Sequence, residues 1–197
     1  MMSSAKVREA CLDDLDALST LFKAHIEEQA RWNPLFQLNP EFSFIAFVRN
    51  HIMSGSQMIL LAHDNGEIIG FVRLNIQKGE SLLEFRESGG DRLFRRLSPG
   101  AALRKILAWL KAFIKKIDSL PRMSQPMVIG YIADIFIVPD HRKQGVGQLL
   151  LSHGIDWLRR QDVEWIYLQV QAENQAGIKF WQKNQFKPSN LFMIRKP

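Results

Sequence analysis

Cysteine is almost absent from this chain of 197 residues, and long hydrophobic runs are absent altogether. Its one cysteine, Cys11, excludes an internal disulfide and a metal site built from cysteines alone, and it suits a reducing compartment. No apolar run approaches the roughly 18 residues that cross a bilayer, and residues 1–7 lack the apolar stretch of a secretory signal. We therefore expect a cytoplasmic protein without an integral membrane segment.

Two common phosphate-binding signatures are missing as well. The chain has no Gly-x-Gly-x-x-Gly dinucleotide fingerprint and no Gly-Lys-Ser/Thr of a P-loop. Acidic residues are also in deficit, since 26 Lys and Arg against 20 Asp and Glu give a net charge of +6. Most of that excess lies in residues 79–126, with ten basic and five acidic side chains. A basic segment favours anionic partners, but the nearly neutral remainder says little about the central activity.

Hydrophobic periodicity and turn residues divide the chain into strands and helices of a single domain over residues 1–197. Asn65-Gly66 is a strong hairpin signal, and Asn39-Pro40-Glu41 has the cap and the proline that start a helix. We expect strands at 6–10, 58–62, 68–74, 127–138, 164–171 and 191–194, and helices that begin near 13, 39, 98, 145 and 174.

The segment from 134 to 150 is the most informative part of the sequence. An apolar strand stops at Pro139, and a polar turn with Arg142, Gly145 and Gly147 then opens a helix. The first backbone N–H groups of a helix have no internal partner, and the helix dipole adds partial positive charge there. Glycines let the backbone approach a phosphate without a Cβ in the way. The pattern therefore predicts a phosphate-bearing ligand.

Two blocks of sequence carry a family resemblance. Residues 138–147, Val-Pro-Asp-His-Arg-Lys-Gln-Gly-Val-Gly, resemble the acetyl-CoA pyrophosphate loop of the GNAT superfamily of N-acetyltransferases. Residues 174–186, Asn-Gln-Ala-Gly-Ile-Lys-Phe-Trp-Gln-Lys-Asn-Gln-Phe, resemble the Asn-x-x-Ala-x-x-aromatic-Tyr-x-x-x-Gly-Phe stretch that follows in that family. A helix and a strand separate the blocks, as in the family, and the match covers roughly residues 128–188.

The resemblance implies a fold and a reaction. The fold would be α+β, with a central mixed, mostly antiparallel sheet that splays at its one parallel strand pair and has helices on both faces. Acetyl-CoA would be the co-substrate, no metal would be needed, and a primary amine would attack the thioester directly. The acceptor would be the amine of a small molecule or a peptide.

The resemblance also implies cofactor-binding residues. Main-chain groups of Ile135, Phe136 and Ile137 would pair with pantetheine as though it were another strand, because its amides mimic a peptide. Asn174 would face the cofactor arm, cap a helix, or do both. Arg142 would brace the loop whose backbone amides hold the pyrophosphate: Lys143, Gln144, Gly145, Val146, Gly147 and Gln148.

The catalytic positions depart from the family pattern. Many members use Tyr as the acid that protonates the leaving thiolate, and that position here is Trp181, whose indole N–H is no useful proton donor. A branch that acts on protein N-termini uses Glu where this chain has Gln169, and Gln185 replaces the usual Gly. These departures weaken an assignment to the protein N-terminal branch.

Three other residues are candidates for the chemistry. Asp134 lies at the edge of the cofactor-binding strand and could deprotonate an amine through water, or act as a hydrogen-bonded strand acid. Tyr131 would lie on the opposite face of a regular strand, although a bulge would change that. Tyr167, the only other tyrosine, could supply the acid if its side chain faces the site. Histidines on predicted helix faces are interpreted as packing or surface residues: His25, His51 and His153.

Residues 79–126 form an insertion where the family usually has a short link. A predicted helix after Ser98-Pro99 has an apolar side and a basic side. It could be a lid over the acceptor, a wall that selects an anionic acceptor, a homodimer face, a membrane-surface helix, or a packed helix with a solvated basic side. Two rival functions stay open: a CoA-binding regulatory module without catalysis, and a nucleic-acid or membrane-surface binder that uses residues 92–116. For the acetyltransferase we expect no specific nucleic-acid partner.

Overall fold

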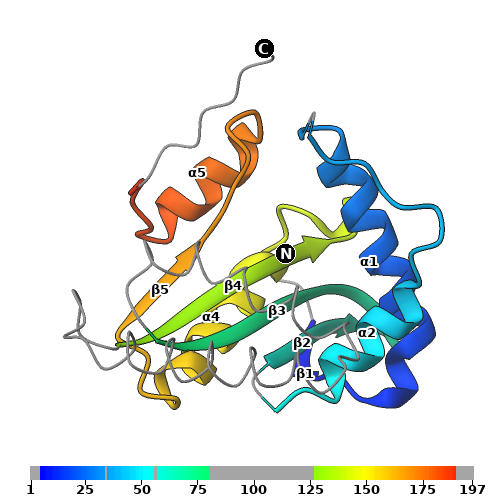
Figure 1. Ribbon diagram of the computed structural model, residues 1–197, viewed down its shortest axis with the longest axis horizontal. Coiled ribbons are helices and arrows are strands. Elements are labelled where there is room, and N and C mark those ends of the chain that lie inside the picture. The colour runs from blue at the N-terminus through cyan, green and yellow to red at the C-terminus, as the bar shows by residue number, and fades with distance from the viewer. Residues whose placement is uncertain (1–4, 34, 56, 80–126, 190–197) are drawn as a thin grey trace, which may run out of the picture.

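The computed structural model describes residues 5–33, 35–55, 57–79 and 127–189 (Figure 1). The predicted helix after Ser98 and the predicted strand at 191–194 lie outside these ranges, as does nearly all of the insertion at 79–126. Within the described ranges, no helix is both long enough and apolar enough to cross a membrane.

Five strands form one mixed sheet in the order β1-β2-β3-β4-β5. Neighbouring strands are antiparallel except for β4 and β5, which are parallel. This confirms the predicted mixed, mostly antiparallel sheet with one parallel pair. The strands are β1 (Lys6–Glu9), β2 (Gln57–Asp64), β3 (Glu67–Gly79), β4 (Met127–Ile137) and β5 (Trp165–Leu168).

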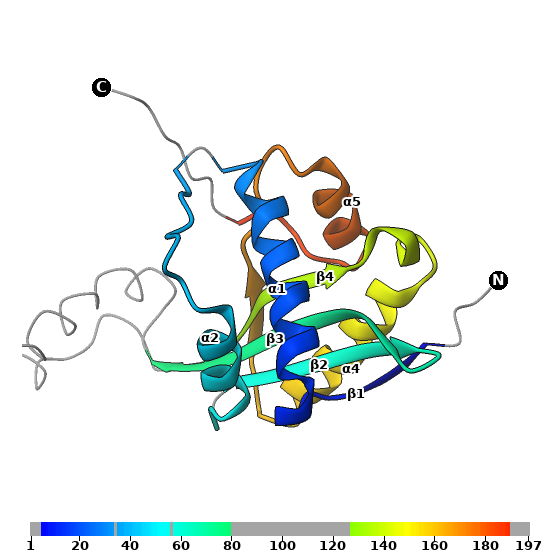
Figure 2. The same ribbon diagram turned by 90° about the vertical axis from the view of Figure 1, so that its right-hand side faces the viewer.

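Helices cover both faces of the sheet, as predicted (Figures 1 and 2). Helices α1 and α2 pack on one face, over a core that includes Phe22 and Phe71, and this face is called the α1 face below. Helix α4 packs on the other face, over a core that includes Leu74 and Leu150. The helices are α1 (Leu15–Ala30), α2 (Phe44–Ile52), α4 (Val146–Arg159) and α5 (Gln175–Lys183).

Helix α2 begins later than the sequence predicted. Asn39 does not cap it, because its Oδ1 accepts a hydrogen bond from the N–H of Glu41 and closes a local turn. Ser43 is the cap instead, and its Oγ accepts from the N–H of Ala46. The predicted start at residues 39–41 was therefore wrong. Asparagine is common in both roles, as a helix cap and as a turn residue.

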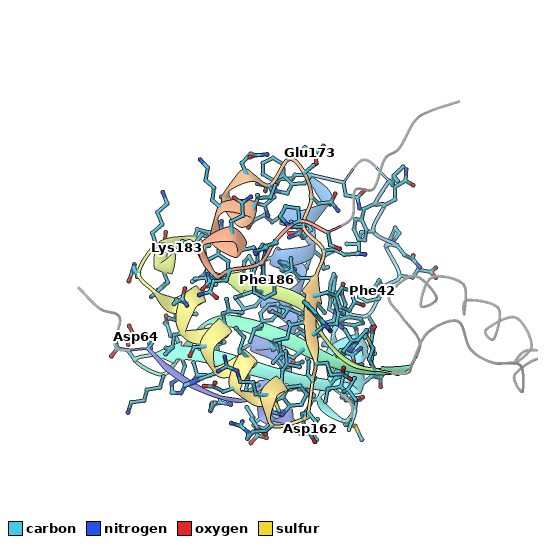
Figure 3. The ribbon with its side chains drawn as sticks, turned by 90° about the vertical axis from the view of Figure 1, so that its left-hand side faces the viewer. Phe42, Asp64, Asp162, Glu173, Lys183 and Phe186 are labelled. Carbon is cyan, nitrogen blue, oxygen red and sulfur yellow. The ribbon has the colours of Figure 1, made fainter. Side chains whose placement is uncertain are left out.

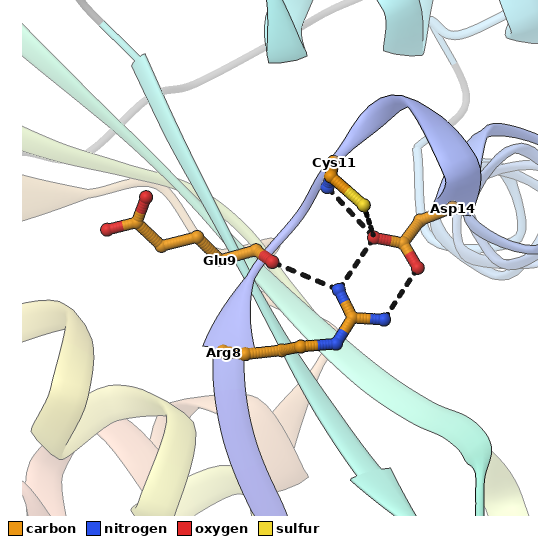
Figure 4. A network of polar contacts seen from close by, with 4 residues as sticks. All are labelled: Arg8, Glu9, Cys11 and Asp14. Atoms are coloured by element: carbon orange, nitrogen blue, oxygen red, sulfur yellow. Dashed lines mark hydrogen bonds and ion pairs between the residues drawn. The ribbon is translucent and has the colours of Figure 1, made fainter.

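The start of α1 is fixed by a buried carboxylate. Both oxygens of Asp14 accept hydrogen bonds from Arg8 on β1, each at 2.7 Å (Figure 4). The backbone N–H and the thiol of Cys11 donate to the same carboxylate, at 2.8 and 3.2 Å. The hydrogen bond from Arg8 outweighs burial and holds the pKa of Asp14 well below its ordinary 3.8.

Strands β4 and β5 part before β4 ends (Figure 1). Their parallel pairing runs from Ile129–Trp165 to Ile132–Leu168, whereas β4 continues to Ile137 in contact with β3. Over residues 133–137, the β4 edge away from β3 therefore has no partner among the described strands. This is the splay that the resemblance implied.

A bulge in β4 decides which residues share a face. The register of β3 and β4 shifts by one residue near Arg73, which leaves Ala133 as an extra residue on β4. Tyr131 lies opposite Asn75, and Asp134 lies opposite Arg73. Because residues 73 and 75 point to one face of β3, Tyr131 and Asp134 lie together on the α1 face.

Candidate active site

The polar turn after β4 presents backbone groups at the start of α4. The chain leaves β4 through a short 3-10 turn at Pro139–His141, and Gly145 then occupies the N-cap of α4 with a φ of +89°. Only glycine adopts this left-handed conformation without a steric cost, which explains its presence there. Lys143 is also left-handed, with a φ of +60°.

Six consecutive amides are available in this turn. In the part of the chain that the structure describes, the N–H groups from Lys143 to Gln148 donate to no protein acceptor. The first helical bond there runs from the N–H of Leu149 to the carbonyl of Gly145. Free amide donors at the positive end of a helix dipole suit a phosphate. The six residues expected to hold the pyrophosphate thus lie in one donor-rich turn.

Arg142 ties this turn to β4 and to α1. Its Nε donates to the carbonyl of Ile137 at 2.9 Å, and its Nη2 pairs with Glu28 at 2.6 Å. Its guanidinium carbon lies 5.6 Å from the ring centroid of Phe136. The side chains of Arg142 and Glu28 are 40% and 38% exposed, so the pair lies at the surface. These contacts fit the bracing role expected of Arg142.

Gly147 is not required by the packing of the free chain. A Cβ on this residue would lie 3.4 Å from Cδ1 of Ile137 and 3.5 Å from Cε2 of Phe180, which are ordinary contact distances. Its φ is not left-handed, unlike that of Gly145. We infer that the missing side chain leaves room for a ligand.

The second sequence block forms α5 and the turns beside it. Asn174 caps α5, because its Oδ1 accepts a hydrogen bond from the N–H of Gly177 at 2.9 Å. The cap role considered for Asn174 is therefore confirmed, and its cofactor contact stays a prediction. Figure 3 shows Glu173 and Lys183 at the two ends of α5, and both residues are exposed.

Two departures from the family pattern have a structural explanation in this block. Trp181 is buried and packs against Phe180 and Phe186, so the side chain at the usual acid position belongs to the core. Gln185 has a φ of +67°, a conformation in which glycine is the favoured residue. The family's usual glycine at this position therefore suits the backbone that this chain adopts with glutamine.

On the α1 face, side chains from four elements meet around Asp134. Oδ2 of Asp134 accepts from Nε of Arg73 on β3 at 2.6 Å and forms an ion pair with Nη2 of Arg73, also at 2.6 Å. Its Oδ1 accepts from Nε2 of His25 on α1 at 3.0 Å. Nη1 of Arg73 donates to Nε2 of His51 on α2 at 2.8 Å. Nδ1 of His51 in turn donates to the carbonyl of Phe47 at 2.7 Å. One continuous hydrogen-bonded chain thus joins α1, β4, β3 and α2.

The charges in this chain of contacts are fixed by burial and pairing. Burial alone would raise the pKa of Asp134, but the hydrogen bond from His25 and the charge of Arg73 outweigh it, and the pKa lies below its ordinary value. Asp134 is therefore an ionised carboxylate with both oxygens engaged. Burial lowers the pKa of His51, which keeps that ring neutral as the acceptor for Arg73.

Two tyrosines stack on the same face, where β4 and β5 are still paired. The ring centroids of Tyr131 and Tyr167 are 4.6 Å apart, and the rings are 22° from parallel. The hydroxyl of Tyr167 donates to Oε1 of Gln77 at 2.9 Å, whereas that of Tyr131 has no hydrogen-bond partner among the described residues. Burial raises the pKa of Tyr131, and the charge of Asp134 raises it further, so this phenol stays protonated at neutral pH.

Asp134, Tyr131 and Tyr167 were predicted from the sequence as candidates for the chemistry, whereas the residues that contact them were not. His25 and His51 were interpreted as packing or surface residues, and both instead belong to the polar chain around Asp134, while His153 is exposed as expected. One signal was present in β3, where the positions that follow Phe71 on the α1 face are polar: Arg73, Asn75 and Gln77. Such a switch from apolar to polar at alternate positions marks where the core of that face ends.

The described residues contain no cluster of His, Cys, Asp or Glu that could hold a metal ion. The arrangement offers amide donors, an open strand edge, a free phenol and a histidine–carboxylate pair. Those groups can bind phosphate and peptide-like chains and can move protons.

Comparison with curated proteins finds short but significant relatives. The [Ribosomal protein bS18]-alanine N-acetyltransferase of Escherichia coli strain K12 is 34% identical over 58 residues, which cover 29% of this chain and 39% of that protein. The uncharacterized N-acetyltransferase YobR of Bacillus subtilis strain 168 is 28% identical over 108 residues, which cover 52% of this chain and 40% of that protein. The chain therefore spans about two fifths of the length of these curated relatives.

Solved structures and a family model match much more of the chain. A mutant form of the BH1408 protein from Bacillus halodurans aligns with a TM-score of 0.67 at 16% identity, over 98% of this chain and 99% of that one. Aminoglycoside N-acetyltransferase AAC(6')-Iy, solved with CoA, aligns with a TM-score of 0.63 at 15% identity, over 100% and 97%. These likenesses show the fold. The model of the acetyltransferase (GNAT) family matches residues 20–186, and the chain belongs to that family.

Proposed function

We propose that this chain transfers an acetyl group from acetyl-CoA to a primary amine by direct attack of the amine on the thioester. One observation carries the proposal: the amide-lined turn at 143–148 follows directly on a strand whose edge is open over 133–137. The turn suits a pyrophosphate and the open edge suits the amides of pantetheine, and CoA carries both groups in one molecule. Family membership and a neighbour of the same fold solved with CoA support this ligand.

The cofactor would bind mainly to backbone. Main-chain groups of Ile135, Phe136 and Ile137 would pair with pantetheine, and the amides from Lys143 to Gln148 would hold the pyrophosphate. Arg142 keeps the turn in place through the carbonyl of Ile137. Asn174, at the N-terminus of α5, follows β5 on the other side of the splay, where it could meet the cofactor arm.

Tyr131 is the best candidate to protonate the leaving sulfur. Its hydroxyl has no partner among the described residues, and its raised pKa keeps the proton in place until the thiolate forms. Tyr167 is anchored by Gln77 and would hold the Tyr131 ring by stacking. Asp134 shares the face of Tyr131 and would complete the polar surface on which the amine is placed. Placement of an amine against an activated thioester contributes several kcal/mol by itself.

Thiol release in the presence of acetyl-CoA and an amine panel tests the proposal. The panel covers a peptide with an N-terminal alanine, an aminoglycoside and a polyamine, and release is expected with at least one of them. Gly147→Asp should abolish CoA binding, measured by calorimetry, because a carboxylate would enter the phosphate site. Gly55→Asp is the matched control, since Gly55 has no atom within 4 Å of an added Cβ.

Two outcomes would favour the rival functions. Tight CoA binding without thiol release for any amine would indicate a regulatory module. Salt-dependent binding of nucleic acid or acidic vesicles that survives Gly147→Asp, without CoA binding by the wild type, would indicate a binder that uses residues 92–116. Neither outcome is expected from the site geometry.

A further inference from the structure

The carboxylate of Asp134 is poorly suited to take a proton from a substrate. Both of its oxygens already accept hydrogen bonds, from Arg73 at 2.6 Å and from His25 at 3.0 Å. Its pKa lies below the ordinary value because these partners outweigh the effect of burial. A carboxylate with a lowered pKa, whose two oxygens are already engaged by a guanidinium and an imidazole, is a weak proton acceptor.

The geometry does fix the tautomer of His25. A carboxylate can only accept, so the proton between the two groups is carried by Nε2 of His25. When the ring is neutral, its lone pair therefore lies on Nδ1. In the described part of the chain, no group donates to that atom. The same division of labour, with a carboxylate that orients an imidazole, operates in hydrolytic triads on other folds.

His25 also lies beside the strand segment that would hold pantetheine. Its ring centroid is 5.5 Å from that of Phe136, which follows the bulge in β4. Glu28, three residues further along α1, contacts Arg142, which directly precedes the amide-lined turn at 143–148. One face of α1 thus reaches both the Asp134 cluster and the cofactor loop. The His25 residue is only 4% exposed, so a substrate amine would reach its ring through an intervening water.

We propose that His25 is the proton acceptor of this site and that Asp134 is the positioning residue that holds its tautomer. The inference rests on the proposed acetyl transfer. The acceptor ammonium loses one proton through water to Nδ1 of His25, and the neutral amine attacks the thioester carbon. The C–N bond forms and the C–S bond breaks, the thiolate takes the proton of Tyr131, and the new amide nitrogen returns a proton to Tyr131. His25 finally releases its proton to solvent.

The charged and titratable neighbours of His25 are consistent with its role as the proton acceptor. Asp134 on β4 faces it directly, and Arg73 on β3 holds the far oxygen of that carboxylate. His51 on α2 stays neutral behind Arg73, and Tyr131 on β4 stays protonated. The His25 ring also packs against three aromatic rings, those of Phe22, Phe71 and Phe136.

Substitution of each partner, read as a pH profile of kcat/KM, tests the inference. His25→Gln should lower kcat/KM at neutral pH by roughly a hundredfold or more, and the loss should shrink at high pH as the free amine forms without a base. Asp134→Asn should give a similar loss, because its amide would donate to Nε2 and force the ring proton onto Nδ1. His153→Gln, an exposed histidine on α4, is the matched control and should leave the profile unchanged.

The possible results distinguish a failure of the role proposed for His25 from a failure of the proposed acetyl transfer. A His25→Gln variant that keeps the acidic limb of the wild-type profile, while Asp134→Asn loses it, would make Asp134 the base and overturn the inference alone. Equal losses at every pH would show a merely structural role and overturn it too. A wild type that binds CoA but releases no thiol would overturn the proposed function and the inference together.

Ring nitrogen NMR of the wild type gives a test that does not depend on a folded variant. When the ring is neutral, the His25 spectrum should show a proton on Nε2 and none on Nδ1. Nδ1 should then become protonated over the same pH range in which turnover falls. A proton on Nδ1 throughout the titration, or none at any pH, would overturn the inference.

Discussion

The two halves of the proposed site, one for the cofactor and one for the acceptor, are built from different parts of the polypeptide. The cofactor half is backbone, namely the amides at 143–148 and the open β4 edge, and it comes from one short stretch of chain. The acceptor half is side chains from α1, α2, β3 and β4, and its contact between His25 and Asp134 spans 109 residues. A backbone site tolerates changes of side chain, whereas a buried side-chain cluster leaves an unpaired partner whenever one member is lost. Mutations should therefore affect ligand affinity in one half and stability in the other.

The largest expected effect is a difference in stability loss between substitutions of two arginines, Arg73 and Arg142. Arg73→Leu should lower the free energy of unfolding by about 3–5 kcal/mol, because it strips the cation from a carboxylate that is only 12% exposed. Arg142→Leu removes an ion pair whose partners are 40% and 38% exposed, and should cost less than about 1 kcal/mol while it weakens CoA binding. Urea unfolding and calorimetric CoA titration measure both variants. Equal losses of stability in the two variants would contradict this difference between the two halves.

Asp14 is a second buried carboxylate, and it lies outside both halves of the site. Its substitution should therefore change stability without changing activity. The pKa of Asp14 is lowered by its hydrogen bond from Arg8, so the unfolded chain binds its proton at a higher pH than the folded one. The stabilisation is therefore complete above the ordinary value of 3.8 and is lost as the pH falls through the lower folded value.

Asp14→Asn should lower the free energy of unfolding at neutral pH by about 1–3 kcal/mol. The gap between variant and wild type should narrow as the pH falls below the ordinary value of the carboxyl. Urea unfolding across acidic pH measures the gap, and thiol release at neutral pH should stay unchanged because Asp14 lies outside the site. A gap that widens in acid would contradict the assigned role of Arg8.

Within the cofactor half, substitution of two glycines should have different effects, one mainly on stability and the other mainly on CoA affinity. Gly145→Ala should cost about 1–2 kcal/mol of stability, because its φ is +89°. Gly147→Ala should cost less, since its added Cβ would meet neighbours at ordinary distances. It should nevertheless weaken CoA binding by roughly tenfold, or about 1.4 kcal/mol, if the phosphate occupies that space. Thermal melts and CoA titrations separate the two effects, and wild-type affinity in Gly147→Ala would place the phosphate elsewhere.

What could be predicted from the sequence follows the same division. The turn at 142–148 was predictable because its strand, its glycines and its helix start are contiguous, and the order of strands and helices follows from hydrophobic period. The shared face of Tyr131 and Asp134 was not predictable, because the extra residue on β4, Ala133, leaves no mark in the residue pattern. His25 could not be linked to Asp134, because only the packed fold brings α1 onto β4. The start of α2 was mistaken because Asn39 can close a turn as well as cap a helix.

The smallest expected effect concerns the position where this chain lacks the family's glycine. Gln185 has a φ of +67°, which costs a side-chain-bearing residue roughly 1–2 kcal/mol. Glycine removes that cost but gives the unfolded chain more freedom, which offsets about 0.5–1 kcal/mol. Gln185→Gly should therefore stabilise the chain by about 0.5 kcal/mol, or raise the melting temperature by roughly 1–2 °C. Gln182→Gly, at an exposed position inside α5, is the matched control and should destabilise the chain by up to about 1 kcal/mol.

CoA affinity should stay the same in Gln185→Gly, because the turn after α5 supplies none of the amides at 143–148. If affinity rises with stability, that turn belongs to the cofactor half, and the family's glycine is selected for the ligand as well as for the backbone.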